Sequence, residues 1–183
     1  MGRQAIAATG AIVALAAAAR RRTVRRPASS PGGARRLWVV HHNAVSPDMP
    51  EASRHWELAT LLREHGWQTV IFSMGFNHKE RRYLRPTSPL RPVVRRCEQG
   101  VDFSWVYTTP YRDNDWRRYV SSASFLITVA AAGLTQGARP DVVIGVSPHL
   151  LSGLAGWVVA RLQRAPFLLE VQDLWPESLV QLG

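Results

Sequence analysis

Residues 37–73, LWVVHHNAVSPDMPEASRHWELATLLREHGWQTVIFS, contain the pattern that decides the fold. The apolar run at 37–42 predicts a buried strand, and a second apolar run at 68–73 predicts another. Between them, apolar residues recur near helical spacing over 53–65, and Gly66 follows as a helix stop. A strand, a helix and a strand in this order predict two parallel strands joined by a right-handed crossover.

The rest of the chain continues this alternation. Residues 76–92 are polar and rich in arginine and proline, and we expect a long loop there. The runs at 93–97 and 102–108 flank Gln-Gly at 99–100 and are predicted to pair as a hairpin. Further elements are predicted as a helix over 116–134, a strand over 141–146, a helix over 150–163 and a strand over 167–171. Strands alternating with helices indicate an α/β fold with a doubly wound, mostly parallel sheet.

The basic charge of the chain belongs to its first 36 residues. Of the 23 basic residues, eight are arginines within 1–36, where no acidic residue occurs. The folded part, 37–183, therefore has 15 basic and 13 acidic residues, is nearly neutral, and predicts no nucleic-acid partner. The one cysteine, Cys97, excludes a disulfide framework within the chain and a cysteine-rich zinc site.

The leader, residues 1–36, has three interpretations. Its apolar run at 5–19 is mostly alanine and is short for a membrane-spanning helix. Residues 1–36 are therefore either a leader without fixed structure, a weak membrane anchor, or a cleaved signal peptide. The arginines at 20–26 favour retention on the cytoplasmic side. We therefore expect a cytoplasmic domain that lies at the inner face of the cytoplasmic membrane, either peripherally or weakly anchored.

The motifs of several common enzyme classes are missing from the sequence. The segment 43–52, after the first predicted strand, contains no glycine, which disfavours a nicotinamide dehydrogenase. No GxxxxGK[ST] phosphate loop, GxSxG nucleophile elbow or HExxH pair occurs either. These absences disfavour P-loop enzymes, serine hydrolases of this fold and HExxH metalloproteases.

Polar residues follow three of the predicted strands. Ligands of doubly wound sheets bind beyond the carboxyl ends of the strands, so we expect these three segments to converge on one crevice. The segments begin at His41, at Ser147 and at Gln172, the start of QDLWPES. Asp173 is either a residue of this crevice or only the cap of the helix that Pro176 begins.

The two adjacent histidines and the following helix carry weaker expectations. Strand alternation predicts that one of His41 and His42 faces the core and the other faces outward. Arg54 is either near a phosphate or a solvated first-turn residue, and His55 is predicted to be a surface or packing residue.

These segments together resemble the N-terminal domain of glycosyltransferase family 4, in the branch similar to fucosamine and other amino-sugar transferases of surface-polysaccharide assembly. The matching stretches are 39–71, 139–162 and 164–183, of which EVQDLWPES at 170–178 is the most specific. The resemblance implies a Rossmann-like domain, the N-terminal half of a GT-B fold. The donor-binding half, with a paired-glutamate motif, would lie outside these 183 residues. Residues 49–52, MPEA, stand where the family often has glycines that approach the donor's phosphates.

The resemblance also implies an activity and a set of site residues. The expected reaction is retaining transfer of a hexosamine-type sugar from a nucleotide diphosphate sugar to a lipid-linked or glycan acceptor, without metal or cofactor. The chain alone is expected to be inactive, with the donor bound through a second domain or a partner chain. The expected catalytic residues are Asp173 and Glu177, and the expected substrate-binding residues are His42, Arg54, Ser147, His149 and Glu170.

Other readings stay open at this point. The domain could be a non-catalytic relic or a split-enzyme subunit that serves as a binding or scaffold module, and a sugar-nucleotide epimerase of GT-B architecture is a further alternative. The helix predicted over 116–134 either covers the sheet or lies against a membrane, since aromatic residues and arginines precede its apolar part.

Overall fold

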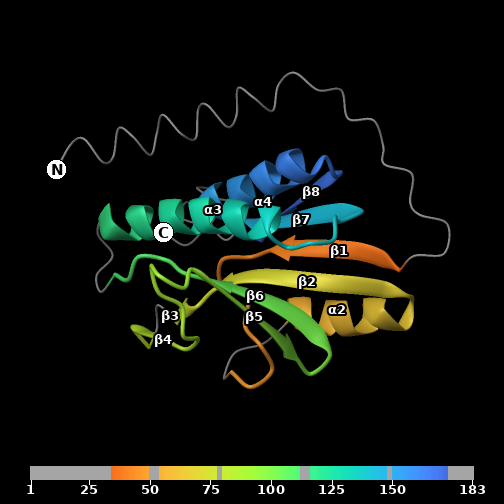
Figure 1. The fold of residues 1–183 in the computed structure, drawn as a ribbon, viewed down its shortest axis with the longest axis horizontal. Coiled ribbons are helices and arrows are strands. Elements are labelled where there is room, and N and C mark those ends of the chain that lie inside the picture. The colour runs from red at the N-terminus through yellow and green to blue at the C-terminus, as the bar shows by residue number, and fades with distance from the viewer. Residues whose placement is uncertain (1–33, 50–53, 78–79, 112–115, 148–149, 173–183) are drawn as a thin grey trace, which may run out of the picture.

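The computed structural model describes residues 34–49, 54–77, 80–111, 116–147 and 150–172. A six-stranded sheet lies at the centre of these residues, and helices cover both of its faces (Figure 1). The strands are β1 (Arg35–Val40), β2 (Trp67–Met74), β5 (Val93–Glu98), β6 (Val101–Val106), β7 (Val142–Ser147) and β8 (Phe167–Val171). The helices are α2 (Arg54–Glu64), α3 (Trp116–Leu134) and α4 (Leu150–Gln163).

The sheet has the strand order β5–β6–β2–β1–β7–β8. Strand β1 lies in the middle and runs parallel to both neighbours, with Val39 opposite Ile71 of β2 and Ile144 of β7. Strand β5 is antiparallel to β6, and the other four pairings are parallel. The structure thus confirms an α/β fold with a mostly parallel sheet.

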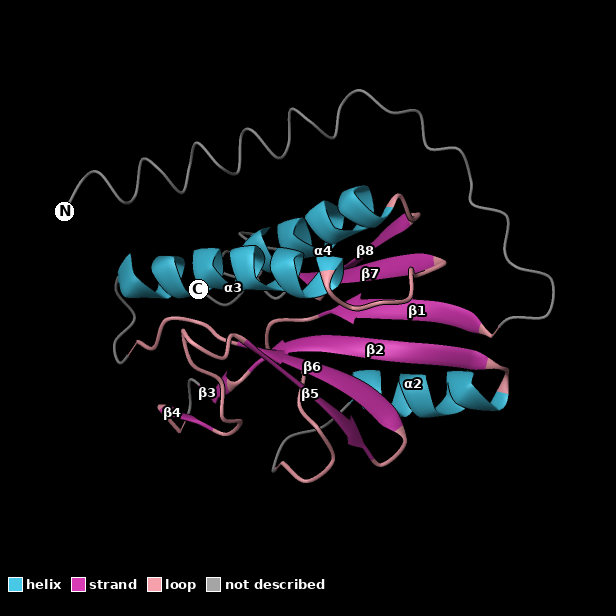
Figure 2. Ribbon diagram, viewed as in Figure 1, coloured by secondary structure: helices cyan, strands magenta, loops and turns pink. Residues whose placement is uncertain are grey.

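The two faces of the sheet bury separate cores, because successive side chains of a strand point to opposite sides. From β1, Trp38 and Val40 pack with residues of α3 and α4. Leu37 and Val39 pack toward α2 and the segment that follows β1. Figure 2 shows α3 and α4 on one side of the sheet and α2 on the other.

This double covering corrects the expectation for the two histidines. His41 and His42 do point to opposite faces, but neither is exposed (8% and 4%). The ring of His41 lies 4.7 Å from that of His55 in α2, whereas the ring of His42 lies 4.8 Å from that of Phe125 in α3. The prediction that one of them faces outward was wrong because both sides of the sheet are covered at this point.

Helix α4 approaches β7 closely through glycines. A Cβ atom on Gly156 would lie 2.6 Å from the Cα atom of Gly145 in β7. A Cβ atom on Gly153 would lie 2.9 Å from Cδ1 of Leu169 in β8, which is the end of a flexible side chain. Glycine has only a hydrogen atom as its side chain, so these two residues allow α4 to pack closer to the sheet than residues with a Cβ atom would.

Most of the predicted elements agree with the structure, and two details differ. The helices over 116–134 and 150–163 and the hairpin formed by β5 and β6 are confirmed. Strand β1 begins at Arg35, so the last two arginines of the predicted leader belong to the sheet.

The loop expected over 76–92 contains a short hairpin of β3 (Phe76–Asn77) and β4 (Arg82–Tyr83). Its strands are only two residues long, and the rings of Phe76 and Tyr83 pack edge to face, with centroids 5.3 Å apart. Within the residues described, no helix is long and apolar enough to cross a membrane.

Candidate functional site

The carboxyl ends of the parallel strands form the edge at which the predicted site residues were expected to meet. Ser147 is the last residue of β7, opposite Val171 of β8. Its side chain lies on the α4 face of the sheet, since its Cβ is 3.5 Å from the position of a Cβ on Gly153. Glu170 lies one position before the end of β8. The predicted residues His149, Asp173 and Glu177 lie outside the described residues.

Two predicted substrate-binding residues, Arg54 and Glu170, are brought together. Nη1 of Arg54, at the start of α2, lies 3.1 Å from Oε1 of Glu170. The Arg54 side chain is 71% exposed and that of Glu170 is 20% exposed. Because the arginine is exposed, the ion pair contributes little stability. It does place a guanidinium group at the sheet edge, facing solvent.

Glu170 also contacts a residue that was not assigned to the site. Its Oε2 atom lies 3.3 Å from Nε2 of His55, which is 4% exposed. Burial lowers the pKa of His55, and the hydrogen bond with Glu170 opposes this only in part. His55 is therefore neutral near pH 7, and its Nε2–H donates to the carboxylate.

Helix periodicity indicates the buried face of α2 but not the contact that His55 makes with Glu170. His55 and Ala59 are four residues apart and are the two buried residues of α2, so they lie on one face of the helix. His55 was predicted to be either a surface or a packing residue, and the structure shows that it is buried. Its partner in β8 is 115 residues away. No local pattern indicates such a pair.

His42 lies between β1, α3 and α4. Its backbone N–H donates to Oγ of Ser152 at 3.2 Å, and Nδ1 is 2.9 Å from Oδ1 of Asn43. His42 also lines a narrow hollow together with Ser73 and Gly75. It thus holds the end of β1 against both helices.

The segment that follows β1 is held by hydrogen bonds from two other elements. Oγ of Ser73 in β2 donates to the carbonyl oxygen of Ala44 at 2.6 Å. Nη2 of Arg85 donates to Oγ of Ser46 at 2.7 Å and to both carboxylate oxygens of Asp48 at 2.9 Å. The hydrogen bond from Ser46 to Asp48, together with Arg85, lowers the pKa of Asp48 despite partial burial. Asp48 is therefore ionised at neutral pH.

Arg85 is itself buried, with 9% of its surface exposed. Its guanidinium carbon lies 4.9 Å from the ring centroid of Trp105 in β6. Its Nε and Nη2 atoms each lie 3.2 Å from an oxygen of Glu98 in β5. Sequence reasoning missed Arg85 and this network, which fixes the segment where dinucleotide-binding domains have flexible glycines.

The arrangement is suited to orientation and charge stabilisation. Arg54 offers an exposed cation, and the N-terminus of α4 directs its dipole toward the end of β7. Among the described residues, no group of three or more His, Cys, Asp or Glu side chains is placed to hold a metal ion.

The family is established by comparison with known proteins. The family model described as a glycosyl transferase 4-like domain matches residues 51–182, which is more than half of the chain. The chain belongs to this family. No curated protein matches the chain.

Membership gives the fold and the site a common frame. The sheet is the Rossmann-like half of a GT-B fold, and the function of a glycosyl transferase 4-like domain is of the glycosyltransferase type. The matched range includes α2, β7, α4 and β8. It therefore includes the elements that bring Arg54, His55 and Glu170 together at the carboxyl edge of the sheet.

Proposed function

We propose that this domain forms the acceptor side of a retaining glycosyltransferase. The enzyme transfers a hexosamine-type sugar from a nucleotide diphosphate sugar to a lipid-linked acceptor, and the donor is held by a second GT-B domain or a partner chain. The observation that carries the proposal is the Arg54–Glu170–His55 cluster at the carboxyl edge of the sheet, in a chain of the glycosyl transferase 4-like family. The amino-sugar branch and the lipid-linked acceptor rest on the resemblance of EVQDLWPES.

The proposed reaction needs no protein nucleophile. The acceptor oxygen bonds to the anomeric carbon as the bond from that carbon to the nucleotide diphosphate breaks. A phosphate oxygen of the leaving group takes the acceptor's proton. The protein supplies orientation and charge stabilisation. We assign Asp173 and Glu177 to the acceptor hydroxyls, and Ser147 and His149 to the wall of the cleft.

We also propose more specific roles for Arg54, Glu170 and His42. Arg54 presents its cation to phosphate, and Glu170 holds Arg54 and the N-terminus of α2 at the sheet edge. His42 is mostly enclosed by packing, so we assign it to positioning the segment after β1.

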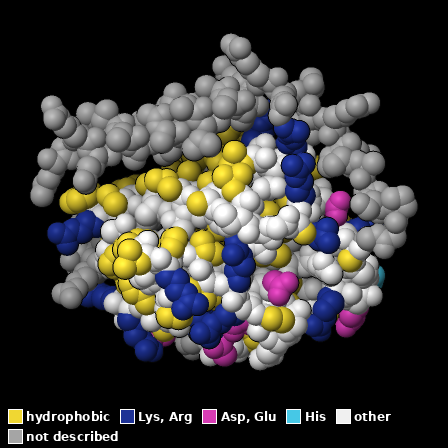
Figure 3. All heavy atoms as spheres, in the orientation of Figure 1, with side chains coloured by type: hydrophobic (Ala, Val, Ile, Leu, Met, Phe, Trp, Pro, Cys, Tyr) yellow, Lys and Arg dark blue, Asp and Glu magenta, His cyan; other side chains and the backbone are white. Residues whose placement is uncertain are grey.

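A surface on α3 and α4 supports the approach to a lipid-linked acceptor. Trp116, Tyr119, Ile127 and Leu134 of α3 are 67%, 72%, 48% and 61% exposed. Their spacing places them on one face of the helix, which we call the α3 stripe. Neither α3 nor α4 contains an acidic residue. Figure 3 shows hydrophobic side chains gathered along these helices. We propose that the α3 stripe rests on an anionic membrane surface, while the opposite face of α3 packs on the sheet.

The test is transfer of radiolabelled N-acetylhexosamine from its uridine diphosphate donor to organic-extractable lipid, by the protein together with its donor-binding domain. We expect Asp173→Asn to lower turnover by about 100-fold or more, while the free energy of unfolding changes by no more than about 1 kcal/mol. The matched control is Asp141→Asn, at the opposite end of the sheet, where Asp141 accepts a hydrogen bond from the Arg36 backbone at 2.8 Å.

Two results would contradict the proposal. Absence of transfer in the presence of the donor domain would favour a non-catalytic binding module. Equal turnover of the Asp173→Asn and Asp141→Asn variants would remove Asp173 from the reaction.

A further inference from the structure

A second pocket lies outside the carboxyl ends of β2 and β6, away from the Arg54–Glu170 pair. It is an open pocket lined by the β3–β4 hairpin, the segment after β6 and the first turn of α3, with a volume of about 280 Å³. Ligand pockets commonly range from about 300 to 1,000 Å³, so this one suits a small group. Its lining includes the aromatic residues Phe76, Tyr83 and Tyr111 and the basic residues Arg81, Arg82 and Arg117.

The floor of the pocket is aromatic and fixed in place. The ring of Tyr83 stacks on that of Tyr107, with centroids 6.0 Å apart, and Phe76 packs against both Tyr83 and Tyr111 at 5.3 and 5.8 Å. The Tyr83 hydroxyl donates to the carbonyl oxygen of Thr108 at 2.7 Å. Burial raises the pKa of Tyr83 and of Tyr111, so both rings stay uncharged.

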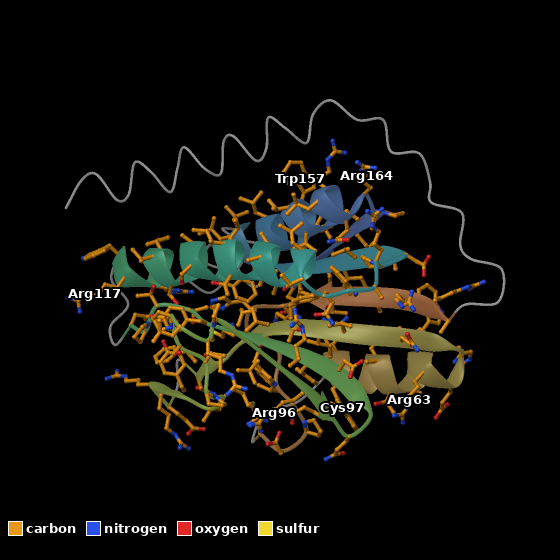
Figure 4. All side chains as sticks on the ribbon, in the orientation of Figure 1. Arg63, Arg96, Cys97, Arg117, Trp157 and Arg164 are labelled. Atoms are coloured by element: carbon orange, nitrogen blue, oxygen red, sulfur yellow. The ribbon has the colours of Figure 1, made fainter. Side chains whose placement is uncertain are left out.

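The rim of the pocket is cationic. Arg81, Arg82 and Arg117 line it, and Arg82 forms an exposed ion pair with Glu80. Figure 4 shows the Arg117 side chain extending outward from the first turn of α3. Arg118 lies near Tyr111, so among the described charged residues around the pocket four arginines accompany one acidic residue, Glu80. The pocket therefore lies in a region of net positive charge.

A cationic rim above a neutral aromatic floor is suited to an anion attached to an apolar group. Guanidinium groups bind phosphate oxygens through paired hydrogen bonds, and aromatic rings contact the apolar part. The pocket also adjoins the α3 stripe, because Trp116 begins that stripe and its ring lies 5.9 Å from the Arg117 guanidinium carbon. An apolar chain that leaves the pocket can therefore continue along α3.

We propose that this pocket binds the phosphate or diphosphate group of a lipid-linked substrate, with Arg81 and Arg117 as the main contacts. The identification of that substrate as the glycosyl acceptor rests on the proposed function, whereas the binding of an isoprenoid diphosphate does not. Such a site would hold the phosphate or diphosphate of the acceptor beyond β2 and β6. The sugar of the acceptor would then extend along the carboxyl edge of the sheet toward Arg54.

The experiment measures binding of geranyl diphosphate, inorganic pyrophosphate and geraniol to the full chain by titration calorimetry. We expect geranyl diphosphate to bind most tightly, pyrophosphate less tightly, and geraniol not measurably. The double variant Arg81→Gln/Arg117→Gln should weaken binding of geranyl diphosphate by about tenfold or more, because charge-assisted hydrogen bonds are lost. The matched control is Arg91→Gln/Arg139→Gln, which removes two exposed arginines outside the pocket and should change binding by less than about twofold.

Circular dichroism establishes whether each variant folds. If the double variant does not fold, the single variants Arg81→Gln and Arg117→Gln replace it, and each should weaken binding of geranyl diphosphate by about threefold or more. The inference is overturned if wild-type protein binds neither diphosphate, or if both double variants bind alike. Binding of phosphatidylglycerol vesicles without binding of soluble diphosphates would also overturn it, since the arginines would then serve a lipid surface. Diphosphate binding without sugar transfer would leave the pocket standing and contradict the proposed function instead.

Discussion

Glu170 of β8 and His55 of α2 lie in contact across the carboxyl edge of the sheet, with 3.3 Å between Oε2 and Nε2. The two residues come from separate strand–helix units, and Arg54 beside His55 contacts the other carboxylate oxygen. The last described strand is thereby joined to the beginning of the first described helix. Protonation of His55 is a direct way to test how much this contact matters.

We expect the protein to lose stability on acidification through His55. Its pKa in the folded protein is below the ordinary value of 6.5 because the ring is buried. The unfolded chain therefore binds more protons as pH falls below about 6.5, and the free energy of unfolding falls by up to about 1.4 kcal/mol per pH unit for this group. Urea unfolding at pH 7.5 and 5.0 measures the effect.

The comparison for this prediction uses two glutamine variants. His55→Gln should reduce the pH dependence, whereas His65→Gln, at an exposed position after α2, should leave it as in the wild type. Equal pH dependence in all three proteins would contradict a buried neutral His55.

The Arg85 network predicts a large loss of stability on truncation. Arg85→Met leaves Glu98, whose side chain is 13% exposed, without the guanidinium, while Asp48 is 54% exposed and can hydrate. We expect a loss of about 2–4 kcal/mol in the free energy of unfolding, measured in urea. Arg82→Met breaks the exposed pair with Glu80 and should cost no more than about 1 kcal/mol. Similar losses in both variants would exclude a special role for the buried arginine.

The glycines of α4 give a pair of matched substitutions. Gly156→Ala directs a methyl group against the backbone of Gly145, which cannot move aside, and should destabilise the protein by about 1–3 kcal/mol. Gly153→Ala meets the end of the Leu169 side chain, which can rotate. The gain in helix propensity, about 0.5–1 kcal/mol, should offset most of its cost. Thermal melts of both variants measure the difference, and a harmless Gly156→Ala would mean that α4 lies farther from β7.

The α3 stripe predicts reversible binding to anionic membranes. Co-sedimentation of the full chain with phosphatidylglycerol vesicles should be strong at low salt and fall at high salt, as charges become screened. Trp116→Ser/Tyr119→Ser should weaken the partition by about tenfold, because two large apolar groups no longer enter the interface. Leu90→Ser removes a residue that is 99% exposed but lies outside the stripe, and should have no effect. Unchanged binding of the double variant would contradict the proposed orientation.

The parts of the fold that were predictable from the sequence depend on local patterns. The helices over 116–134 and 150–163 are blocks of apolar residues with breaks on both sides, and the structure has them with these bounds. Strand alternation, continued past the end of β1 at Val40, predicted that His41 and His42 point to opposite faces of the sheet. Alternation could not indicate that both histidines are buried, because their burial depends on α2 and α3, which cover opposite faces of the sheet at this point.

The parts that could not be predicted depend on distant partners. Arg85 is charged and is followed by Pro86, Pro89 and Pro92, a composition that is typical of a solvated loop. Its partners Asp48 and Glu98 lie 37 and 13 residues away. The β3–β4 hairpin is likewise held by ring contacts with Tyr107 and Tyr111 rather than by strand propensity. Arg54 and Glu170 were selected as separate candidates, and only the fold shows that they form one ion pair.

The central position of β1 has a consequence during synthesis of the chain. Its neighbour β2 follows closely, but its other neighbour, β7, begins only after Asp141, which lies 105 residues beyond its bonding partner Arg36. At about 5–20 residues per second, a ribosome needs roughly 5–20 seconds to deliver that second neighbour. Through this interval one edge of an apolar strand, RRLWVV, has no partner in the sheet. The newly made chain is therefore most vulnerable to aggregation before β7 emerges.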